Sequence, residues 1–373
     1  MKKHLIFSLS LFLSIVSLTA QNKQASNFRI DGTINVDSGK VSLCFHSDYL
    51  PNKIEKLVAQ VKDKKFSISG YIPEAQGVFL VFGNRCTPDF VIEKGLQTIS
   101  INIDSFQTVP KVNNKTMQEE YPKKVIFSQK TIAKSNFIFQ KYDSLLKHYN
   151  YQLPKDISNI VIKERDAMYR ESDSTLLAYT QKNPNSKIAF WNLISLMSWG
   201  YEPIFDSIYN SFSNTLREGY AGKVLGEKLK IGKQLSVGQP FPIIDCQNKN
   251  NEKLASAFFF RNKYTLIDFW YSACAPCRRQ FPNMRDLYKQ YGNNGFEIVG
   301  ISVDKTTRKQ NWEKVIADEK LVWQQYWDKN GTETNRLSIL SFPTNFLIDN
   351  KGKIISKNMS MEELEEFLRE KLK

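Results

Sequence analysis

The sequence predicts a multidomain protein that ends in an α/β domain, a mixed sheet with helices on both faces, preceded by a small antiparallel β domain and a helical region. Three observations support this fold class. The length of 373 residues is enough for two or three domains. Apolar residues alternate with polar ones in the first third of the chain and recur at helical spacing in the middle. In the last third, strand and helix patterns alternate.

The first twenty residues have the parts of a secretory signal peptide. Lys2 and Lys3 give a basic start, an apolar run extends from Leu5 to Leu18, and the small residue Ala20 follows. The run is shorter than the roughly 20 apolar residues that a membrane span needs. An uncleaved anchor is the alternative. We therefore expect residues 1–20 to be a signal peptide and the mature chain to be exported to the periplasm, without a transmembrane segment.

Residues 26–110 predict an antiparallel, sandwich-like accessory β domain. Short alternating segments are separated by turn signals, and they lie at 28–34, 41–45, 66–70 and 99–103. His46 is isolated here, and a lone histidine is more often a strand or surface residue than a metal ligand. We expect no catalytic group in this domain.

Residues 115–236 predict a helical region, because their apolar residues recur at intervals of three and four. Gly200 and Pro203 interrupt two of these helices. The dense aromatic residues fit a packed core better than a ligand site. They are Phe190, Trp191, Trp199 and Tyr201.

Residues 237–373 alternate strands and helices, which predicts a sheet that contains parallel pairs. Ser360 and Glu363 form a capping box at the start of the last helix. A turn signal at 349–352 predicts that the strand after it returns antiparallel. The predicted strands are 265–270, 296–302, 344–349 and 353–356, and the predicted helices are 275–291, 308–318 and 361–372.

The pair Cys274-Ala-Pro-Cys277 carries the clearest chemical signal. It follows a strand and opens a helix, so the positive end of the helix dipole lowers the pKa of the Cys274 thiol. Cys277 lies one turn further, on the buried face of the helix. Pro276 is tolerated in the first turn, where its missing N–H has no helical partner. This pattern predicts a reversible disulfide with one exposed sulfur and one sheltered sulfur.

Other readings of the cysteines are weaker. A zinc site needs a second pair of ligands at close spacing, but Cys44, Cys86 and Cys246 are scattered and the chain has only three histidines. Cys44 and Cys86 either pair within the β domain or stay free. Cys246, in a strand predicted over 243–246, is expected to be a small buried side chain. We expect neither a metal nor a cofactor.

Asp268 lies in the middle of a strand that is expected to be covered on both faces. A buried carboxylate either finds an ionic partner or takes up a proton because its pKa is raised. Six residues before Cys274, it could accept the proton of Cys277, directly or through a water molecule. The alternative is a salt bridge with a lysine or arginine.

The formal net charge of +14 does not predict nucleic-acid binding. The basic excess is spread along the chain rather than gathered in a stripe, and export separates the protein from DNA.

Two motifs, in this order, resemble the thioredoxin superfamily, and more closely the exported TlpA/ResA-type thiol-disulfide oxidoreductases. The resemblance covers residues 237–373 and implies a thioredoxin fold, with an added helix-bearing insertion over 304–327. The motifs are Asp268-Phe-Trp270 with Cys274-Ala-Pro-Cys277 and Pro282, and Ser341-Phe-Pro-Thr-Asn-Phe-Leu-Ile-Asp349.

The resemblance also implies the roles of single residues. Pro343 matches the cis-proline beside the disulfide, and the backbone of Phe342 would pair with an extended substrate segment. Trp270 and Pro276 would complete the substrate-binding surface. The chain departs from the family at Ala273, where a tryptophan is common, at Gly300, where thioredoxin has a lysine facing the buried aspartate, and in the groove. The groove departures are Leu337, Ser338 and Ser341.

Together these features predict a periplasmic thiol-disulfide oxidoreductase that reduces disulfides of exported proteins, with reductant from a membrane-bound partner. The direction stays open, because known dithiols of this fold span about −270 to −120 mV. One alternative is an envelope binding or scaffold module. Another is a thiol peroxidase, which needs a proline and a threonine where the chain has Ile267 and Tyr271.

Overall fold

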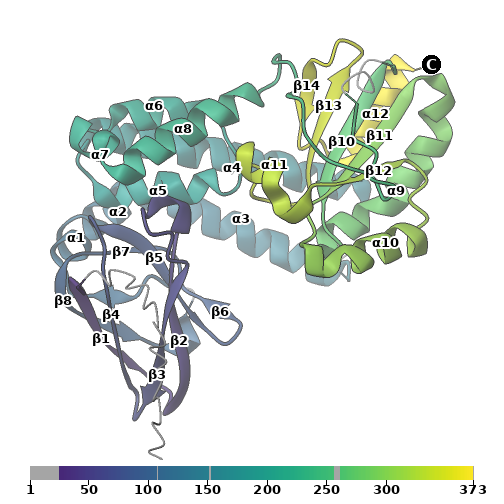
Figure 1. Ribbon diagram of the computed structural model, residues 1–373. Coiled ribbons are helices and arrows are strands. Elements are labelled where there is room, and N and C mark those ends of the chain that lie inside the picture. The colour runs from purple at the N-terminus through teal and green to yellow at the C-terminus, as the bar shows by residue number, and fades with distance from the viewer. Residues whose placement is uncertain (1–24, 107, 151–152, 256–260, 373) are drawn as a thin grey trace, which may run out of the picture.

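The computed structural model describes residues 25–106, 108–150, 153–255 and 261–372. The predicted signal peptide lies outside these ranges. A β domain, a helical region and a C-terminal α/β region follow one another along the chain (Figure 1). The boundaries predicted for these parts as independent domains stay a prediction.

The N-terminal sheet has nine strands in the order β6-β5-β2-β3-β4-β1-β8-β9, with β7 paired to β5. Its pairs are antiparallel except for β1 and β8, which are parallel. The strand β1 therefore lies inside the sheet, between β4 and β8. The strands are β1 (Phe28–Ile34), β2 (Ser38–Phe45), β3 (Lys56–Lys62), β4 (Lys65–Gly70), β5 (Gln76–Phe82), β6 (Arg85–Cys86), β7 (Phe90–Ile92), β8 (Gly95–Ile101) and β9 (Lys111–Val112).

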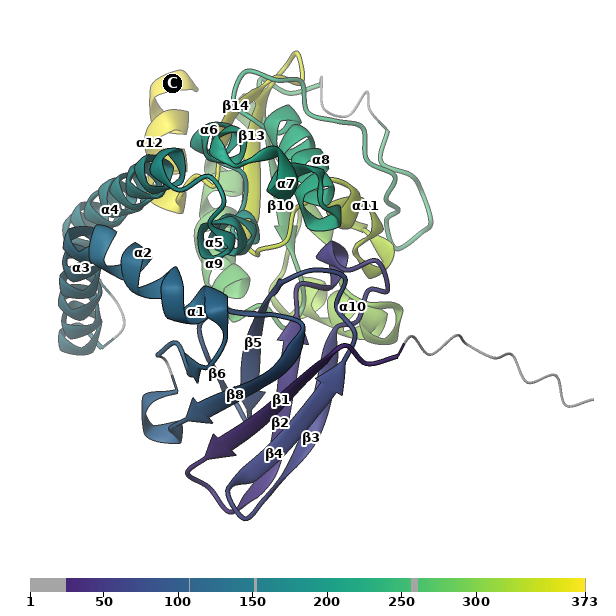
Figure 2. The ribbon, with the colours of Figure 1, turned by 90° about the vertical axis from the view of Figure 1, so that its left-hand side faces the viewer.

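The helical region packs against this sheet around one shared apolar core (Figure 2). Trp191 of α5 contacts both parts: it is buried, its indole N–H donates to the Ala75 carbonyl over 3.2 Å, and its ring stacks on His46. The helices are α1 (Lys115–Glu119), α2 (Tyr121–Phe127), α3 (Gln129–His148), α4 (Lys155–Lys182), α5 (Lys187–Met197), α6 (Ile204–Ser211), α7 (Asn214–Glu218) and α8 (Tyr220–Gln234).

The C-terminal sheet has five strands in the order β12-β11-β10-β13-β14, so β10 is its central strand. Strands β11 and β12 run parallel to β10, whereas β13 runs antiparallel to it. Strand β14 returns antiparallel to β13, as the turn signal predicts. The strands are β10 (Tyr264–Trp270), β11 (Phe296–Ser302), β12 (Gln324–Trp327), β13 (Thr344–Asp349) and β14 (Ile354–Lys357).

Apolar residues cover both faces of this sheet. One face packs against α9 (Ala275–Tyr291), α10 (Lys309–Asp318) and α12 (Met361–Lys371). The other face packs mainly against residues 235–254 and the loop that follows α11 (Thr332–Arg336). The capping box of Ser360 and Glu363 is present at the start of α12. In the described ranges, no helix combines the length and apolar character needed to cross a bilayer.

One local prediction is wrong. Residues 243–246 form no strand: Ile243 is exposed, and only isolated bridges of the following residue, Gln247, are found beside this segment among the described residues. The helix α11 and the strand β12 were not predicted, because five and four residues give too short a pattern to show a period.

The helical region contacts the C-terminal region through the segment between α5 and α6, and Leu235 after α8 packs into the core of the C-terminal sheet. The Ser341 hydroxyl donates to the Trp199 carbonyl over 3.4 Å, and the Lys357 ammonium donates to the Tyr201 carbonyl over 3.4 Å. The segment between α5 and α6 therefore lies beside the loop that precedes β13.

Replacing Trp191 by alanine should lower the free energy of unfolding by about 3–5 kcal/mol, because it removes a buried indole from the contact between α5 and the β domain. Urea unfolding followed by circular dichroism measures this. Trp199→Ala is the control, since Trp199 is 76% exposed and its loss should change the stability by less than about 0.5 kcal/mol. Equal effects of the two substitutions would contradict the assignment.

Candidate functional site

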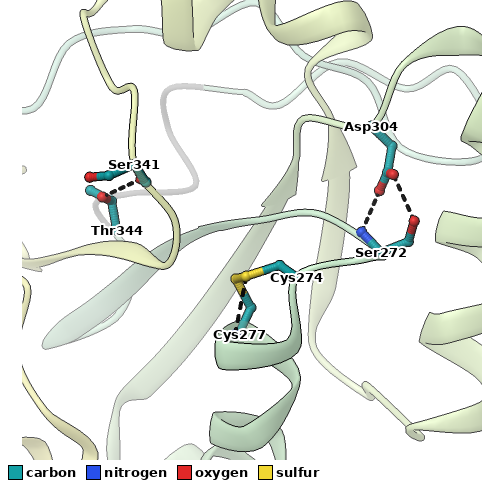
Figure 3. The surroundings of a disulfide bond; sticks show 6 residues. All are labelled: Ser272, Cys274, Cys277, Asp304, Ser341 and Thr344. Atoms are coloured by element: carbon teal, nitrogen blue, oxygen red, sulfur yellow. Dashed lines mark hydrogen bonds between the residues drawn. A yellow bond between two sulfur atoms is a disulfide. The ribbon is translucent and has the colours of Figure 1, made fainter. Parts of the chain in front are cut away.

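The site lies where the central strand β10 passes into helix α9. The strand ends at Trp270, a short turn follows, and Cys274 is the N-cap residue of the helix. Cys274 and Cys277 form a disulfide across the first turn, with their Cα atoms 5.3 Å apart (Figure 3). The predicted positions of both cysteines at the start of the helix are confirmed.

The helix start supplies a hydrogen-bond donor to the first sulfur. The backbone N–H of Cys277 donates to the Cys274 Sγ over 3.2 Å. Pro276, in the first turn, contributes no donor of its own. In the reduced protein the same donor and the positive end of the helix dipole would stabilise a thiolate at Cys274. A disulfide poised in this way can open and reform by thiol exchange.

A buried aspartate holds the turn before Cys274. The Asp304 carboxylate accepts hydrogen bonds from the Ser272 N–H (2.8 Å), the Ser272 hydroxyl (2.7 Å) and the Ser302 hydroxyl (2.8 Å), of which the two from Ser272 are drawn in Figure 3. Sequence reasoning missed this group, because Asp304 is 30 residues away from the cysteines. The register that pairs Ser302 with Trp270 brings it there.

The prediction of an exposed Cys274 sulfur is wrong for the disulfide form, since both cysteines are only 1% exposed. The half-buried rings of Tyr271 and Phe342 meet edge to face, with centroids 5.7 Å apart, and belong to the apolar cluster that encloses the disulfide. The neighbours Ala273, Ala275 and Pro276 are exposed. The disulfide therefore lies just beneath an accessible surface.

Pro343 lies at the site. The Phe342–Pro343 peptide bond is cis, and Phe269 pairs with Thr344, so the next residue pair along the two strands is Trp270 and Pro343. Phe342 makes no backbone hydrogen bond within the described part of the chain. Its N–H and carbonyl are thus free to pair with an added strand.

Trp270 cannot have the predicted contact with substrate, because its side chain is completely buried. Its ring packs edge to face on Phe281 of α9, with centroids 5.2 Å apart. Its indole N–H donates to the Gln325 Oε1 over 3.2 Å. Trp270 therefore fixes α9 to the sheet, whereas Pro276 is exposed and remains a candidate contact.

Asp268 lies in the central strand β10 and is only 3% exposed. Burial raises the pKa of its carboxyl group to about 7. In the ranges that the structure describes, no lysine, arginine or histidine forms an ion pair with it. Asp268 is two residues away from both Leu266 and Trp270, so the three side chains lie on the same face of the strand. Leu266 and Trp270 belong to the apolar cluster that contains Cys277, and Asp268 therefore faces that cluster. A carboxyl group with this pKa can exchange a proton near neutral pH.

The other cysteines lie away from this site. Cys44 and Cys86 are free thiols in the structure, and Cys246 is buried as predicted. The described residues contain no cluster of histidine, cysteine or acidic side chains suited to a metal ion. A cavity of about 1030 Å³ lies beside Phe66 and Met117 in the N-terminal region, remote from the disulfide.

Parts of this chain are similar to known families and proteins. Residues 237–357 match the model of the AhpC/TSA family, and residues 28–121 match a domain of unknown function, DUF4369. The thiol-disulfide oxidoreductase ResA of Bacillus cereus is 31% identical over 158 residues, which cover 42% of this chain and 85% of that protein. ResA of Geobacillus thermodenitrificans is 33% identical over 112 residues, 29% of this chain and 63% of that protein.

A solved structure is also similar to the C-terminal region. It is described as a thiol-disulfide oxidoreductase from Bacteroides fragilis, and it is 34% identical, with a TM-score of 0.33. The match covers 36% of this chain and all of that one.

Asp268→Asn should stabilise the oxidised protein above neutral pH. The carboxyl pKa is raised from 3.8 to about 7, so its favourable contribution is complete below pH 3.8 and is lost as the pH rises through 7. At about pH 8 the substitution should raise the free energy of unfolding by on the order of 4 kcal/mol, and near pH 4 the gain should vanish. Urea unfolding at several pH values measures this.

The control for this prediction is Asp37→Asn, since the Asp37 side chain is 85% exposed. The free energy of unfolding of Asp37→Asn should equal that of the unmodified protein at each pH. A gain for Asp268→Asn that is the same at all pH values would contradict the raised pKa.

Proposed function

Because the chain belongs to the family of thiol-disulfide oxidoreductases that includes ResA, we propose that it exchanges disulfides through Cys274 and Cys277. The observation that carries this proposal is the hydrogen bond from the Cys277 N–H to the Cys274 Sγ at the N-terminus of α9. It marks Cys274 as the sulfur that is stabilised as a thiolate, and a thiolate is the attacking species in disulfide exchange.

In the first step, the Cys274 thiolate of the reduced protein attacks one sulfur of a substrate disulfide. A bond forms between the Cys274 Sγ and that sulfur, the substrate S–S bond breaks, and the other substrate sulfur leaves as a thiolate. The free backbone groups of Phe342, beside Pro343, hold an extended substrate segment. Exposed Pro276 borders the same surface.

In the second step, Asp268 accepts the proton of the Cys277 thiol, and the resulting thiolate attacks the Cys274 Sγ. The mixed disulfide breaks, the second substrate thiolate leaves, and the bond between Cys274 and Cys277 forms. Two electrons have passed from the protein to the substrate. The raised pKa of Asp268 suits this role, because a base with a pKa near the working pH transfers protons efficiently.

The cellular setting extends this proposal. The signal-peptide pattern at residues 1–20 supports export to the periplasm, where disulfides of exported proteins are the substrates. The oxidised protein needs a source of two electrons after each cycle, and we assign that role to a membrane-bound reductant. The regions before residue 237 carry no redox chemistry in this scheme.

A thiol peroxidase is less well supported, although the matching family model carries the AhpC/TSA description. At the two positions where such an enzyme needs proline and threonine, the chain has Ile267 and Tyr271. Ile267 is buried in the sheet, and the Tyr271 ring packs on Phe342. Ile267 has no hydroxyl, and the Tyr271 hydroxyl stands at the far end of an aromatic ring rather than on the β-carbon as in threonine.

Reduction of insulin tests the exchange activity. The reduced protein should accelerate insulin precipitation in the presence of dithiothreitol, and Cys274→Ser should lower the rate to that of dithiothreitol alone, because the attacking sulfur is lost. Cys246→Ser is the matched control, since Cys246 is a free, buried cysteine that takes no part in the disulfide. If the unmodified protein and Cys274→Ser were equally inactive, the scaffold alternative would replace this proposal.

Trapping identifies the substrates. Cys277→Ser should accumulate mixed disulfides with envelope proteins, because Cys274 still attacks but no resolving thiol remains. Non-reducing electrophoresis followed by mass spectrometry detects them. The double variant with Cys274→Ser and Cys277→Ser should capture none. An envelope extract that gives the same bands with both variants would show that the captured proteins do not react through Cys274.

A further inference from the structure

The side chain of Gln325, on β12, extends across β11 toward Trp270 at the end of β10. Its Oε1 accepts the indole N–H of Trp270, which fixes Oε1 as the acceptor and leaves the amide Nε2 as a donor. That Nε2 is buried and has no hydrogen-bond partner among the described residues. A buried donor without a partner costs free energy, and such groups in native proteins often serve a function.

Gly300 makes room for this amide. A Cβ atom at Gly300 would lie 2.3 Å from the Gln325 Oε1 and 2.8 Å from its Nε2, so no other residue could occupy position 300 without moving the Gln325 side chain. The register pairs Gly300 with Asp268 on one side and with Gln325 on the other. Residues paired in this way share one face of the sheet. The Gln325 amide therefore extends over Gly300 toward the strand position of Asp268.

The other groups around Asp268 on this face are these. On β13 the paired residue is Asn345, whose Nδ2 donates to the Met359 carbonyl and whose Oδ1 accepts the Met359 N–H. The cluster contributes Cys277 and Tyr291 from α9, Trp312 from α10, and apolar side chains from α12. The Trp312 indole N–H is also buried without a partner among the described residues, but of these two unpartnered donors Gln325 is the one that the strand register places level with Asp268. Burial raises the pKa of Asp268.

We propose that Gln325 is a positioning residue for Asp268: its buried Nε2 donates a hydrogen bond to one water molecule, which in turn donates to the ionised carboxylate. Its Oε1 is held by Trp270, so the donor is fixed in direction. This inference rests on the proposed role of Asp268 as the base for Cys277. The donor favours the ionised form of Asp268 and so keeps a proton acceptor available as the mixed disulfide is resolved.

Titration of Asp268 in the oxidised protein tests this role without any turnover. The side-chain carboxyl of ¹³C-labelled aspartate is followed by NMR between about pH 4 and 9, with Asp268→Asn identifying the resonance. Gln325→Leu should raise the pKa of Asp268 by about one unit, because the donor is lost. Gln325→Glu keeps the acceptor for Trp270, removes the donor and adds a negative charge, so it should raise that pKa by more than Gln325→Leu does.

The matched control is Gln324→Glu, which adds the same charge one residue away, at an exposed position. It should leave the pKa of Asp268 unchanged. Gln325→Glu also covers the case in which Gln325→Leu fails to fold. An unchanged Asp268 pKa in the folded Gln325 variants would overturn the proposal and show that Gln325 serves only to anchor Trp270.

The pH profile of insulin reduction separates this proposal from the proposed function. Both Gln325 variants should move the acid limb of the rate to higher pH by the same amount as the NMR titration. If Asp268→Asn leaves the profile unchanged, the role of Asp268 as base fails, whatever the titration gives. If Asp268→Asn removes the acid limb of the pH profile but the Gln325 variants do not shift it, the role of Asp268 as the base stands and the role of Gln325 fails.

Discussion

The site depends on the hydrogen bond between the Cys277 N–H and the Cys274 sulfur at the first turn of α9. This contact exists because Cys274 is the N-cap residue and the first N–H groups of a helix have no partner within it. The surrounding residues hold that helix start in place. Asp304 accepts two hydrogen bonds from Ser272 in the turn before it and one from Ser302 of β11, and Phe281 packs the next turns of the helix on Trp270.

Strand β10 gathers the remaining components because it is the central strand of the C-terminal sheet. Its antiparallel partner β13 brings Pro343 level with Trp270, and its parallel partners β11 and β12 bring Gly300 and Gln325 level with Asp268. The central position also buries Asp268 on every side, and this burial raises the pKa of its carboxyl group to about 7. One topological fact therefore brings Asp268, Pro343 and the start of α9 to the same site.

The sequence pattern was sufficient for those parts of the site that adjoin one another along the chain. The strand, turn and helix around Cys274 follow from local propensity, and the buried Asp268 follows from its place in an apolar strand. Asp304 and Gln325 could not be predicted, because they reach the site only through the register of β11 and β12. Trp270 was misjudged, since a motif position does not reveal which way a fully buried ring points.

Exposure of Cys274 was also beyond sequence reasoning. Helix position predicts the pKa of a thiol, but burial depends on side chains that arrive from elsewhere, here Phe342 from the loop before β13. The parallel pairing of β1 with β8 is a similar case, because alternation shows that a segment is a strand without naming its neighbour.

That pairing of β1 has a consequence for biosynthesis. Strand β1, the first strand among the described residues, lies inside the N-terminal sheet, and its two neighbours are β4 and β8. Its register with β8 joins Phe28 to Gly95, so 67 residues must be synthesised before the sheet can close around it. Non-local pairing of this kind delays folding. In the growing chain, β1 therefore lacks its second neighbour until β2 to β7 have all been synthesised.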